Sequence, residues 1–135
     1  ATALPFIIKG ILSVHDALVC KEIGIDAIVV SHHGGRMKYA VPPAMLLQDI
    51  RKAVDRDMLI FVDCGISSGM DAYKALALGA DAVCVGNAFV PALRVEGKNG
   101  VVNGFRNMAV ELKDVMCLTS VSDCSKFDPG VIHMK

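Results

Sequence analysis

The chain lacks tryptophan, a net charge and any long uninterrupted apolar run. Its 135 residues carry 14 basic and 14 acidic side chains. This balance gives none of the excess positive charge with which proteins bind nucleic acids or anionic membrane surfaces. Charged residues also interrupt every apolar stretch well before the roughly 18 residues that span a bilayer. We therefore expect neither a nucleic acid nor a membrane among its partners.

The chain also lacks any C-x-x-C pair, although it contains five cysteines. An odd number of thiols inside apolar segments is typical of reduced, buried cysteines. The sequence shows no targeting segment and no metal-ligand spacing. We therefore expect a cytoplasmic protein without a metal site. Because the chain starts at Ala1 without a methionine, already inside a strand-like run, we also expect a processed product or a fragment of a longer protein.

Apolar residues, in contrast, are abundant and make up 53% of the chain. The mean hydropathy of +0.49 is high for a monomer. Such a composition is typical of a sheet covered on both faces, or of a surface buried by another chain. The length fits a single domain, residues 1–135, in which we expect an irregular tail over residues 119–135.

Short apolar runs alternate with helical patterns, and glycines or prolines separate them. This alternation predicts β-α units joined into a parallel sheet. The expected strands are Pro5–Ile8, Ala27–Ser31, Leu59–Val62 and Ala82–Val85, and the expected helices are His15–Ile23, Ala44–Val54, Gly69–Leu78 and Gly100–Leu118, with a helical turn at Phe89–Arg94.

The chain also repeats itself. Residues 4–31 align with residues 59–86 without a gap, and 11 of the 28 positions are identical. Each copy reads strand, Gly-Ile turn, helix, Gly-x-Asp-Ala, strand, so the four units form two copies of a β-α-β-α repeat. Such units build (β/α)8 TIM barrels. We therefore predict an α/β fold that is half of a TIM barrel; a small doubly wound open sheet is the alternative.

Half a barrel exposes two parallel edge strands and the apolar side chains that fill the interior of a closed barrel. Two copies related by a two-fold axis can close these edges. We therefore expect a homodimer or higher oligomer, or else a missing N-terminal half-barrel as the partner.

The most unusual stretch follows the second expected strand. Ser31-His32-His33-Gly34-Gly35-Arg36 comes directly after a fully apolar run. In a parallel α/β sheet, ligands bind and chemistry occurs at the carboxyl ends of the strands. A base, a cation and two glycines in one loop predict a functional site, whereas a polar turn that leaves a buried strand is the plainer interpretation.

Two later strand ends have the composition of a phosphate site. Asp63-Cys64-Gly65-Ile66-Ser67-Ser68-Gly69 follows the third expected strand and opens a helix, and Gly86-Asn87 follows the fourth strand. Glycines let backbone N–H groups approach an anion, and a helix N-terminus favours negative charge. The segments predict a phosphate-bearing ligand; the alternative is that their glycines only make tight turns.

Four motifs together resemble the family of FMN-dependent 2-hydroxy-acid oxidases and dehydrogenases, which includes glycolate oxidase, lactate oxidase and flavocytochrome b2. These motifs are Ile8-Lys9-Gly10-Ile11, Ser31-His32-His33-Gly34-Gly35-Arg36, Asp63-Cys64-Gly65-Ile66 and Lys74-Ala75-Leu76-Ala77-Leu78-Gly79-Ala80. The resemblance covers roughly residues 5–118 and corresponds to the C-terminal half of the family's barrel. It implies FMN as the cofactor and the oxidation of a small 2-hydroxy acid to the 2-oxo acid.

The resemblance also implies roles for individual residues. His33 matches the base that takes a proton from the substrate, and Arg36 matches the arginine that binds the substrate carboxylate. Lys9 matches a lysine beside the flavin ring, where a cation stabilises the reduced flavin. The other expected flavin-binding residues are Ser31, Gly34, Gly35, Asp63, Gly65, Ile66, Ser67, Gly86 and Asn87.

The chain departs from the family pattern at three places. The family usually has Asn where this chain has His32, Gly-Gly-Ile-Arg-Arg where it has residues 64–68, and Gly-Arg where it has Gly86-Asn87. Both arginines that hold the FMN phosphate in the family are therefore absent. Two alternative functions remain open, a non-catalytic half-barrel that binds a phosphate-bearing ligand and a barrel enzyme of another chemistry, such as a nucleotide dehydrogenase.

Overall fold

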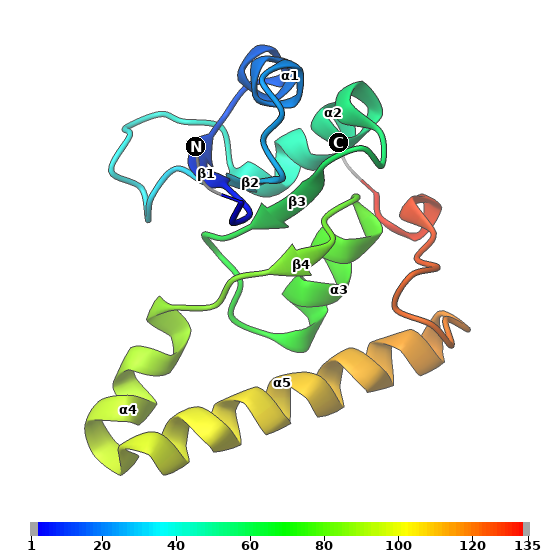
Figure 1. Ribbon diagram of the computed structural model, residues 1–135. Coiled ribbons are helices and arrows are strands. Elements are labelled where there is room, and N and C mark those ends of the chain that lie inside the picture. Colours follow the sequence, from blue (N-terminus) through cyan, green and yellow to red (C-terminus); the bar gives the residue numbers. More distant parts are fainter. Residues whose placement is uncertain (1–2, 134–135) are drawn as a thin grey trace.

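The computed structural model describes residues 3–133, in which strands and helices alternate along the chain (Figure 1). The strands are β1 (Ile7–Ile11), β2 (Ala27–Val30), β3 (Leu59–Val62) and β4 (Ala82–Val83). The helices are α1 (Val14–Glu22), α2 (Pro43–Val54), α3 (Gly69–Ala77), α4 (Val90–Glu96) and α5 (Lys98–Leu118), with 3₁₀ helices η1 (Asn87–Phe89) and η2 (Pro129–Val131). Within the described residues, no helix combines the length and the apolarity needed to cross a membrane.

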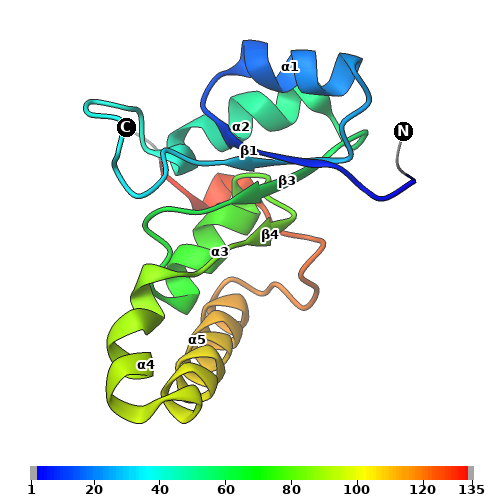
Figure 2. The same cartoon turned by 60° about the vertical axis from the view of Figure 1, so that its left-hand side comes forward.

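The four strands form one sheet in the order β1-β2-β3-β4, and every neighbouring pair is parallel. Each connection passes through one helix, so the sheet consists of successive β-α units. Helices α1 and α2 lie side by side, with α1 next to β1 and α2 next to β2 and β3, and α3 lies next to β4 (Figure 2). This arrangement confirms the predicted α/β half-barrel.

The first strand differs from its predicted range. It begins at Ile7 rather than Pro5, because proline has no N–H to donate to a sheet, and it continues to Ile11. Gly10 adopts a φ of +103°, and the register of β1 against β2 shifts between Lys9 and Ile11. A bulge at this glycine therefore lets the strand pass a residue that was expected to end it.

The end of the chain also differs in detail from the prediction. The fourth strand has only two residues, and the expected turn at Phe89–Arg94 is the end of η1 followed by α4. After α5, the only regular element of the described tail is η2. Residues 1 and 2 of the predicted domain and residues 134 and 135 of its predicted tail lie outside the described residues.

One face of the sheet packs against the helices. Strand side chains alternate between the two faces, and those of this face contact the apolar stripe of α2. The buried side chains that form this core include Ile28 and Val30 of β2, Ile60 and Val62 of β3, and Leu47, Ile50 and Val54 of α2, all at most 1% exposed. Burial of each such side chain stabilises the fold by about 1.5–3 kcal/mol.

The opposite face of the sheet carries its side chains in rows. Parallel register places Ile7, Ala27 and Leu59 in one row, and Lys9, Val29, Phe61 and Ala82 in the next. Ile7 and Leu59 are 49% and 50% exposed, so their side chains are open to solvent, whereas Ala27 and Val29 of the strand between them are buried. In a closed barrel, the side chains of this face form the packed interior.

The two copies of the repeat use identical residues for the same local tasks. Ser13 caps α1 by accepting a hydrogen bond from the Asp16 amide, and Ser68 caps α3 by accepting one from the Asp71 amide. The Asp26 carboxylate accepts from the backbone N–H of Phe6, and the Asp81 carboxylate accepts from that of Ile60. The internal repeat is therefore structural: each copy caps its helix in the same way, and its aspartate accepts from a backbone N–H near the start of the first strand, one position earlier in the second copy.

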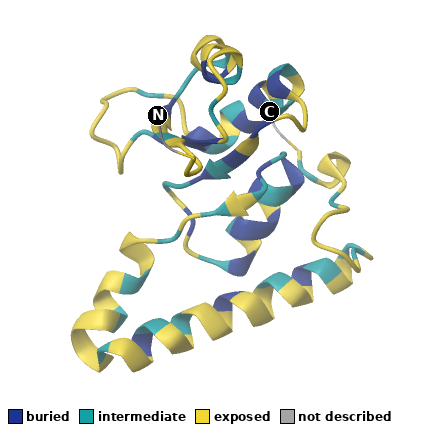
Figure 3. Ribbon diagram, viewed as in Figure 1, coloured by how far each residue is buried: buried dark blue, intermediate teal, exposed yellow. Residues whose placement is uncertain are grey.

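The long helix α5 packs along α3 and against α4, and much of its remaining surface faces solvent (Figure 3). Gly69 at the start of α3 permits this contact, because a Cβ there would lie 2.3 Å from the backbone nitrogen of Leu112 in α5. The Gly69 amide also donates to the Glu111 carboxylate of α5 at 2.9 Å. Close backbone approach therefore fixes α5 against the helix that follows the third strand.

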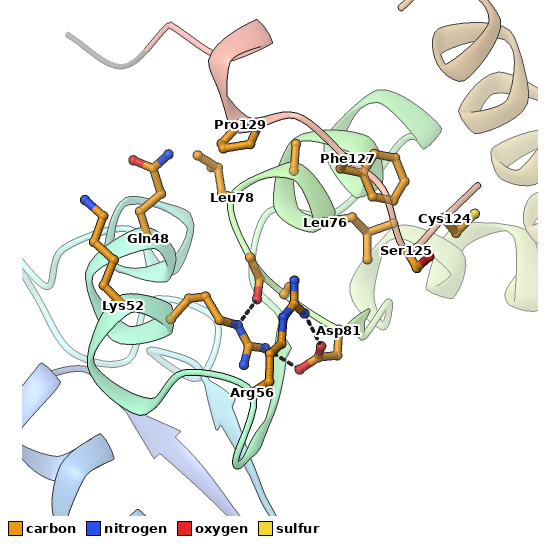
Figure 4. A pocket seen from close by; sticks show the side chains of 14 residues that line it. Gln48, Lys52, Arg56, Leu76, Leu78, Asp81, Cys124, Ser125, Phe127 and Pro129 are labelled. Carbon is orange, nitrogen blue, oxygen red and sulfur yellow. Dashed lines mark hydrogen bonds and ion pairs between the residues drawn. The ribbon is translucent and has the colours of Figure 1, made fainter. Parts of the chain in front are cut away.

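Arg51 of α2 joins three segments at the opposite end of the sheet from the predicted site. Its guanidinium donates to the carbonyl oxygens of Gly79 at 2.8 Å and Met58 at 3.1 Å, and it also bonds Asp55 and the Asp81 carboxylate. Arg51, Gly79 and Asp81 line a cavity of about 370 Å³ that lies between α2, the end of α3 and the tail, and Figure 4 shows Asp81 and Arg56 in its wall. Exposed Arg56 reaches the same carboxylate at 3.2 Å.

Replacing Arg51 with methionine is expected to destabilise the fold by about 2–4 kcal/mol, because several carbonyl groups lose their donor and the Asp81 carboxylate keeps only the Ile60 amide and exposed Arg56. The side chain of Arg51 is only 13% exposed, whereas that of Arg56 is 71% exposed. The control variant Arg56→Met is therefore expected to cost less than about 1 kcal/mol. Urea unfolding of the two variants measures both values, and equal losses would contradict the structural role assigned to Arg51.

Candidate functional site

A cavity of about 770 Å³ lies where the carboxyl ends of the four strands meet. It brings together ten of the twelve residues predicted as functional, which come from four separate segments of the chain. They are Lys9, His33, Gly34, Gly35, Asp63, Gly65, Ile66, Ser67, Gly86 and Asn87. Ser31 and Arg36 do not line the cavity.

Lys9, Ser31 and Asp63 form a polar cluster across three neighbouring strands. The ammonium group of Lys9 donates to the Ser31 hydroxyl at 2.8 Å and pairs with the Asp63 carboxylate. Ser31 is 2% exposed, because it directly follows β2, the strand between those that carry or precede the two charged residues. Ser31 therefore lies beneath the floor of the cavity, where it holds Lys9, and does not itself line the cavity.

The carboxyl group of Asp63 is held in its charged form. Burial by itself raises the pKa of Asp63, but hydrogen bonds from Cys64, Lys9 and Ser31 and the positive charge of Lys9 outweigh burial. The net result is a pKa below the ordinary value of an aspartate. The cavity floor therefore carries a compensated ion pair, and a ligand anion that approaches Lys9 competes with Asp63 for it.

The loop after β2 has an uncommon backbone. His33, Gly34 and Gly35 are three successive residues with positive φ, at 55°, 67° and 83°. Left-handed backbone favours glycine, so His33 is the exception among them. Each of the three amides donates to a side chain: His33 to the Ser31 hydroxyl, Gly34 to the Cys64 sulfur and Gly35 to Nδ1 of His32.

Arg36 lies beyond this turn, on the exposed part of the loop. Within residues 3–133 it has no hydrogen bond or ion pair, and it does not line the cavity. Of the two residues expected to act on the substrate, only His33 lines the cavity in this conformation of the loop.

The N-terminus of α3 differs from the expected phosphate site. Several donors at this helix end are already used, because Ser68 accepts from the Asp71 amide, Asp71 accepts from the Ser67 amide and hydroxyl, and Glu111 accepts from the Gly69 amide. The Asp71 and Glu111 carboxylates also put negative charge beside this helix end. The amides of Gly65 and Ile66 accordingly remain as donors at this end of the cavity, since no bond to them is formed by the described residues.

Five residues that line the cavity were not among the predicted functional residues: His32, Cys64, Cys84, Val85 and Ala88. His32 and Cys64 hold the loop, and Cys84 lines the cavity near Lys9 and Asp63. Burial and the charge of Asp63 raise the pKa of Cys84 despite the opposing charge of Lys9, so this thiol stays protonated. The sequence offered one indication of these roles, because His32 and Cys64 both depart from the family pattern.

Comparison with known proteins gives consistent matches. A family model described as FMN-dependent dehydrogenase matches residues 1–134. An L-lactate dehydrogenase of Pseudomonas putida F1 is 44% identical over 123 residues, which are 90% of this chain and 32% of that protein. An L-lactate oxidase of Lysinibacillus sphaericus is 43% identical over 122 residues, again 90% of this chain and 32% of that protein. The chain thus spans about a third of the length of these curated relatives.

Solved structures match over a similar share. A mandelate oxidase variant with 2-hydroxy-phenylacetamide superimposes with a TM-score of 0.89 at 42% identity, over 92% of this chain and 37% of that one. A second mandelate oxidase variant, which carries a monooxide FMN adduct, gives a TM-score of 0.84 at 41% identity, over 96% of this chain and 40% of that one.

Replacing Lys9 with methionine is expected to raise the pKa of Asp63 toward its ordinary value. In the native chain, the lowered pKa contributes stability that is present above about pH 4 and is lost as the pH falls through the folded-state pKa. The variant should therefore lose less stability than the native chain between about pH 5 and pH 2.5. Urea unfolding across this range measures the difference.

The matched control is Lys126→Met, since Lys126 is 77% exposed in its ion pair with Asp123. It is expected to leave the acid-range slope almost unchanged. An acid-range slope for Lys9→Met that equals the native slope would show that Lys9 does not hold the Asp63 charge.

Proposed function

The chain belongs to the FMN-dependent dehydrogenase family, and from this premise we propose that it binds FMN at the carboxyl ends of its strands and contributes to oxidation of a small 2-hydroxy acid to the 2-oxo acid. The observation that carries the proposal is the cavity in which Lys9, His33 and the glycines of three loops lie together. Lactate and mandelate, the acids in the names of the matched relatives and structures, define the substrate class.

The residues of the cavity fit a flavin. Gly35, Gly65 and Gly86 have open space where a Cβ would lie, so the backbone at three loops is accessible to a flat ligand. Lys9 supplies a cation, and its exposure of 45% leaves it accessible. At the phosphate end, the uncharged donors of Gly65, Ile66 and Asn87 take the place of the absent arginines, which favours weak binding of FMN.

Two residues of the loop after β2 would act on the substrate. FMN, when bound, supplies the acceptor for two electrons. His33 takes a proton from the substrate at an imidazole nitrogen, a role that suits the neutral ring of a histidine near pH 7. Arg36 binds the substrate carboxylate through its planar pair of N–H donors once the loop turns it toward the cavity.

The ammonium group of Lys9 favours negative charge on the ligand in the cavity. Ser31 holds this ammonium group in place from below, at 2.8 Å. Asp63 forms an ion pair with Lys9 and therefore competes with the ligand for it. The balance between these contacts determines how strongly Lys9 acts on a bound flavin.

Under this proposal, the exposed face of the sheet also requires a partner. Ile7 and Leu59 are half exposed on it, and β1 and β4 are edge strands. A second copy of this chain, or an N-terminal half-barrel, would bury these side chains and pair the two edges.

The cytoplasmic location remains a prediction that rests on the cysteine pattern of the sequence.

The purified chain is expected to bind added FMN, with absorption bands near ~450 nm that bleach when anaerobic L-lactate or another small 2-hydroxy acid is added. His33→Ala is expected to slow this bleaching by roughly 10²–10⁴-fold without loss of the bound flavin, because it removes only the base. Stopped-flow absorption measures both effects.

The matched control is His15→Ala, since His15 is exposed on α1 and does not line the cavity. Bleaching by His33→Ala at the native rate would contradict the role of His33. A chain that stays colourless in excess FMN would instead favour a non-catalytic half-barrel that binds another phosphate-bearing ligand.

Light scattering is expected to give at least twice the monomer mass if a second copy covers the sheet. Leu59→Lys should then dissociate the assembly, because it places a charge in the covered row of side chains. Leu18→Lys is the control, since Leu18 is 43% exposed on α1, on the helix side of the sheet. A monomer at all concentrations would leave an N-terminal half-barrel as the expected partner.

A further inference from the structure

The turn formed by His33, Gly34 and Gly35 depends on three side-chain acceptors. Its successive amides donate to the Ser31 hydroxyl at 3.1 Å, to the Cys64 sulfur at 3.2 Å and to Nδ1 of His32 at 2.9 Å. A run of left-handed residues makes no regular backbone hydrogen bonds of its own, so these acceptors replace them. The conformation of this turn determines where His33 and Arg36 lie.

The bond to His32 differs from the other two in one respect. A backbone N–H can only donate, so Nδ1 of His32 must present a lone pair, and the ring proton must then be on Nε2. A doubly protonated imidazole has no acceptor left. The bond is therefore available only while the ring is neutral.

We propose that His32 is a positioning residue for His33 and Arg36, and that it holds their loop in its neutral form and releases it when it is protonated. Release removes the acceptor of the Gly35 amide and places a second positive charge beside the cavity. The roles of His33 and Arg36 rest on the proposed function, whereas the coupling of loop conformation to His32 does not.

Other titratable or charged groups also face this part of the molecule. They are Lys9 of β1, Asp63 and Cys64 after β3, Cys84 after β4, and His33 and Arg36 in the loop itself. Lys9 and Asp63 are paired with each other, and the other two loop amides use a hydroxyl and a thiol sulfur. His33 is thus the group whose titration must be separated from that of His32, since both are histidines.

Asparagine is the matched replacement for His32. Its Oδ1 is bonded to Cγ, as is Nδ1 of histidine, so it offers an acceptor at nearly the same position without taking up a proton in this pH range. Leucine fills a similar volume with no acceptor. Comparing His32→Asn with His32→Leu therefore separates the effect of the hydrogen-bond acceptor from that of side-chain bulk.

The test uses the full chain labelled with ¹⁵N, in a His33→Gln background that removes the neighbouring imidazole. Amide signals of Gly34 and Gly35 are followed from about pH 8 to pH 5, the range in which histidines change charge. With His32 present, the Gly35 signal should move with a single transition. In His32→Asn it should stay nearly constant, and in His32→Leu it should match the acid form at every pH.

A Gly35 transition that persists in His32→Asn would overturn the proposal, because another group would then cause it. A Gly35 signal in His32→Leu that matches the neutral form would overturn it as well, because the bond would then not hold the turn. If the background variant does not fold, the same comparison is made with native His33, where the transition lost in His32→Asn is the one assigned to His32.

A second measurement connects the loop to substrate binding in the FMN-loaded chain. KM for the 2-hydroxy acid is expected to rise roughly three- to tenfold in His32→Leu relative to His32→Asn at pH 8, since one hydrogen bond is lost. If His32→Leu and His32→Asn have equal KM values although the Gly35 transition depends on His32, then His32 only shapes the loop. Its link to substrate binding would then be overturned. Absence of bound flavin would count against the proposed function alone, because the amide measurement needs no flavin.

Discussion

Parallel hydrogen bonding between neighbouring strands is the constraint on which the rest of the structure depends. Because all four strands run in one direction, their carboxyl ends meet at one edge of the sheet. Loops that are far apart in the sequence are brought together there, and the ion pair of Lys9 with Asp63 passes over the strand that lies between them. The buried hydroxyl of Ser31 fits under this pair because its strand is the central one of the three.

The site is largely neutralised by the protein's own side chains. Asp63 compensates Lys9, and the serine and carboxylate caps of α3 occupy donors that a helix N-terminus otherwise offers to an anion. Under the proposed function, a flavin phosphate would meet uncharged donors and two nearby carboxylates at the α3 end. Affinity at this site has to come mainly from the contacts of the ring and from the open glycine backbone rather than from charge.

Features that depend on short-range patterns could be predicted from the sequence. The apolar run Ala27–Val30 and the glycine stops after the helices indicated the β-α units, and the repeat indicated how many units to expect. The bulge at Gly10 could not be predicted, because a glycine after a strand is equally typical of its end. The exposed position of Arg36 and the capping of α3 by Glu111 depend on loop conformation and on packing of a distant helix, which local patterns do not encode.

The role of His32 shows the same limit at the scale of one side chain. Its neighbour His33 carried the motif, and nothing in the spacing indicated that the first histidine accepts a bond from the Gly35 amide. Only the left-handed turn reveals this need for acceptors. Residues that shape a catalytic loop are therefore harder to recognise in a sequence than residues that point into the site.

The order of the strands has a consequence for how the chain is made. Since β1, β2, β3 and β4 are neighbours in space in the same order as in the sequence, each strand pairs only with segments that are already synthesised. The first β-α-β unit can close while the later units are still on the ribosome, and every new unit adds to an existing edge. Assembly of the sheet can therefore proceed in one direction during translation, and the site at the strand ends is completed when β4 joins the edge.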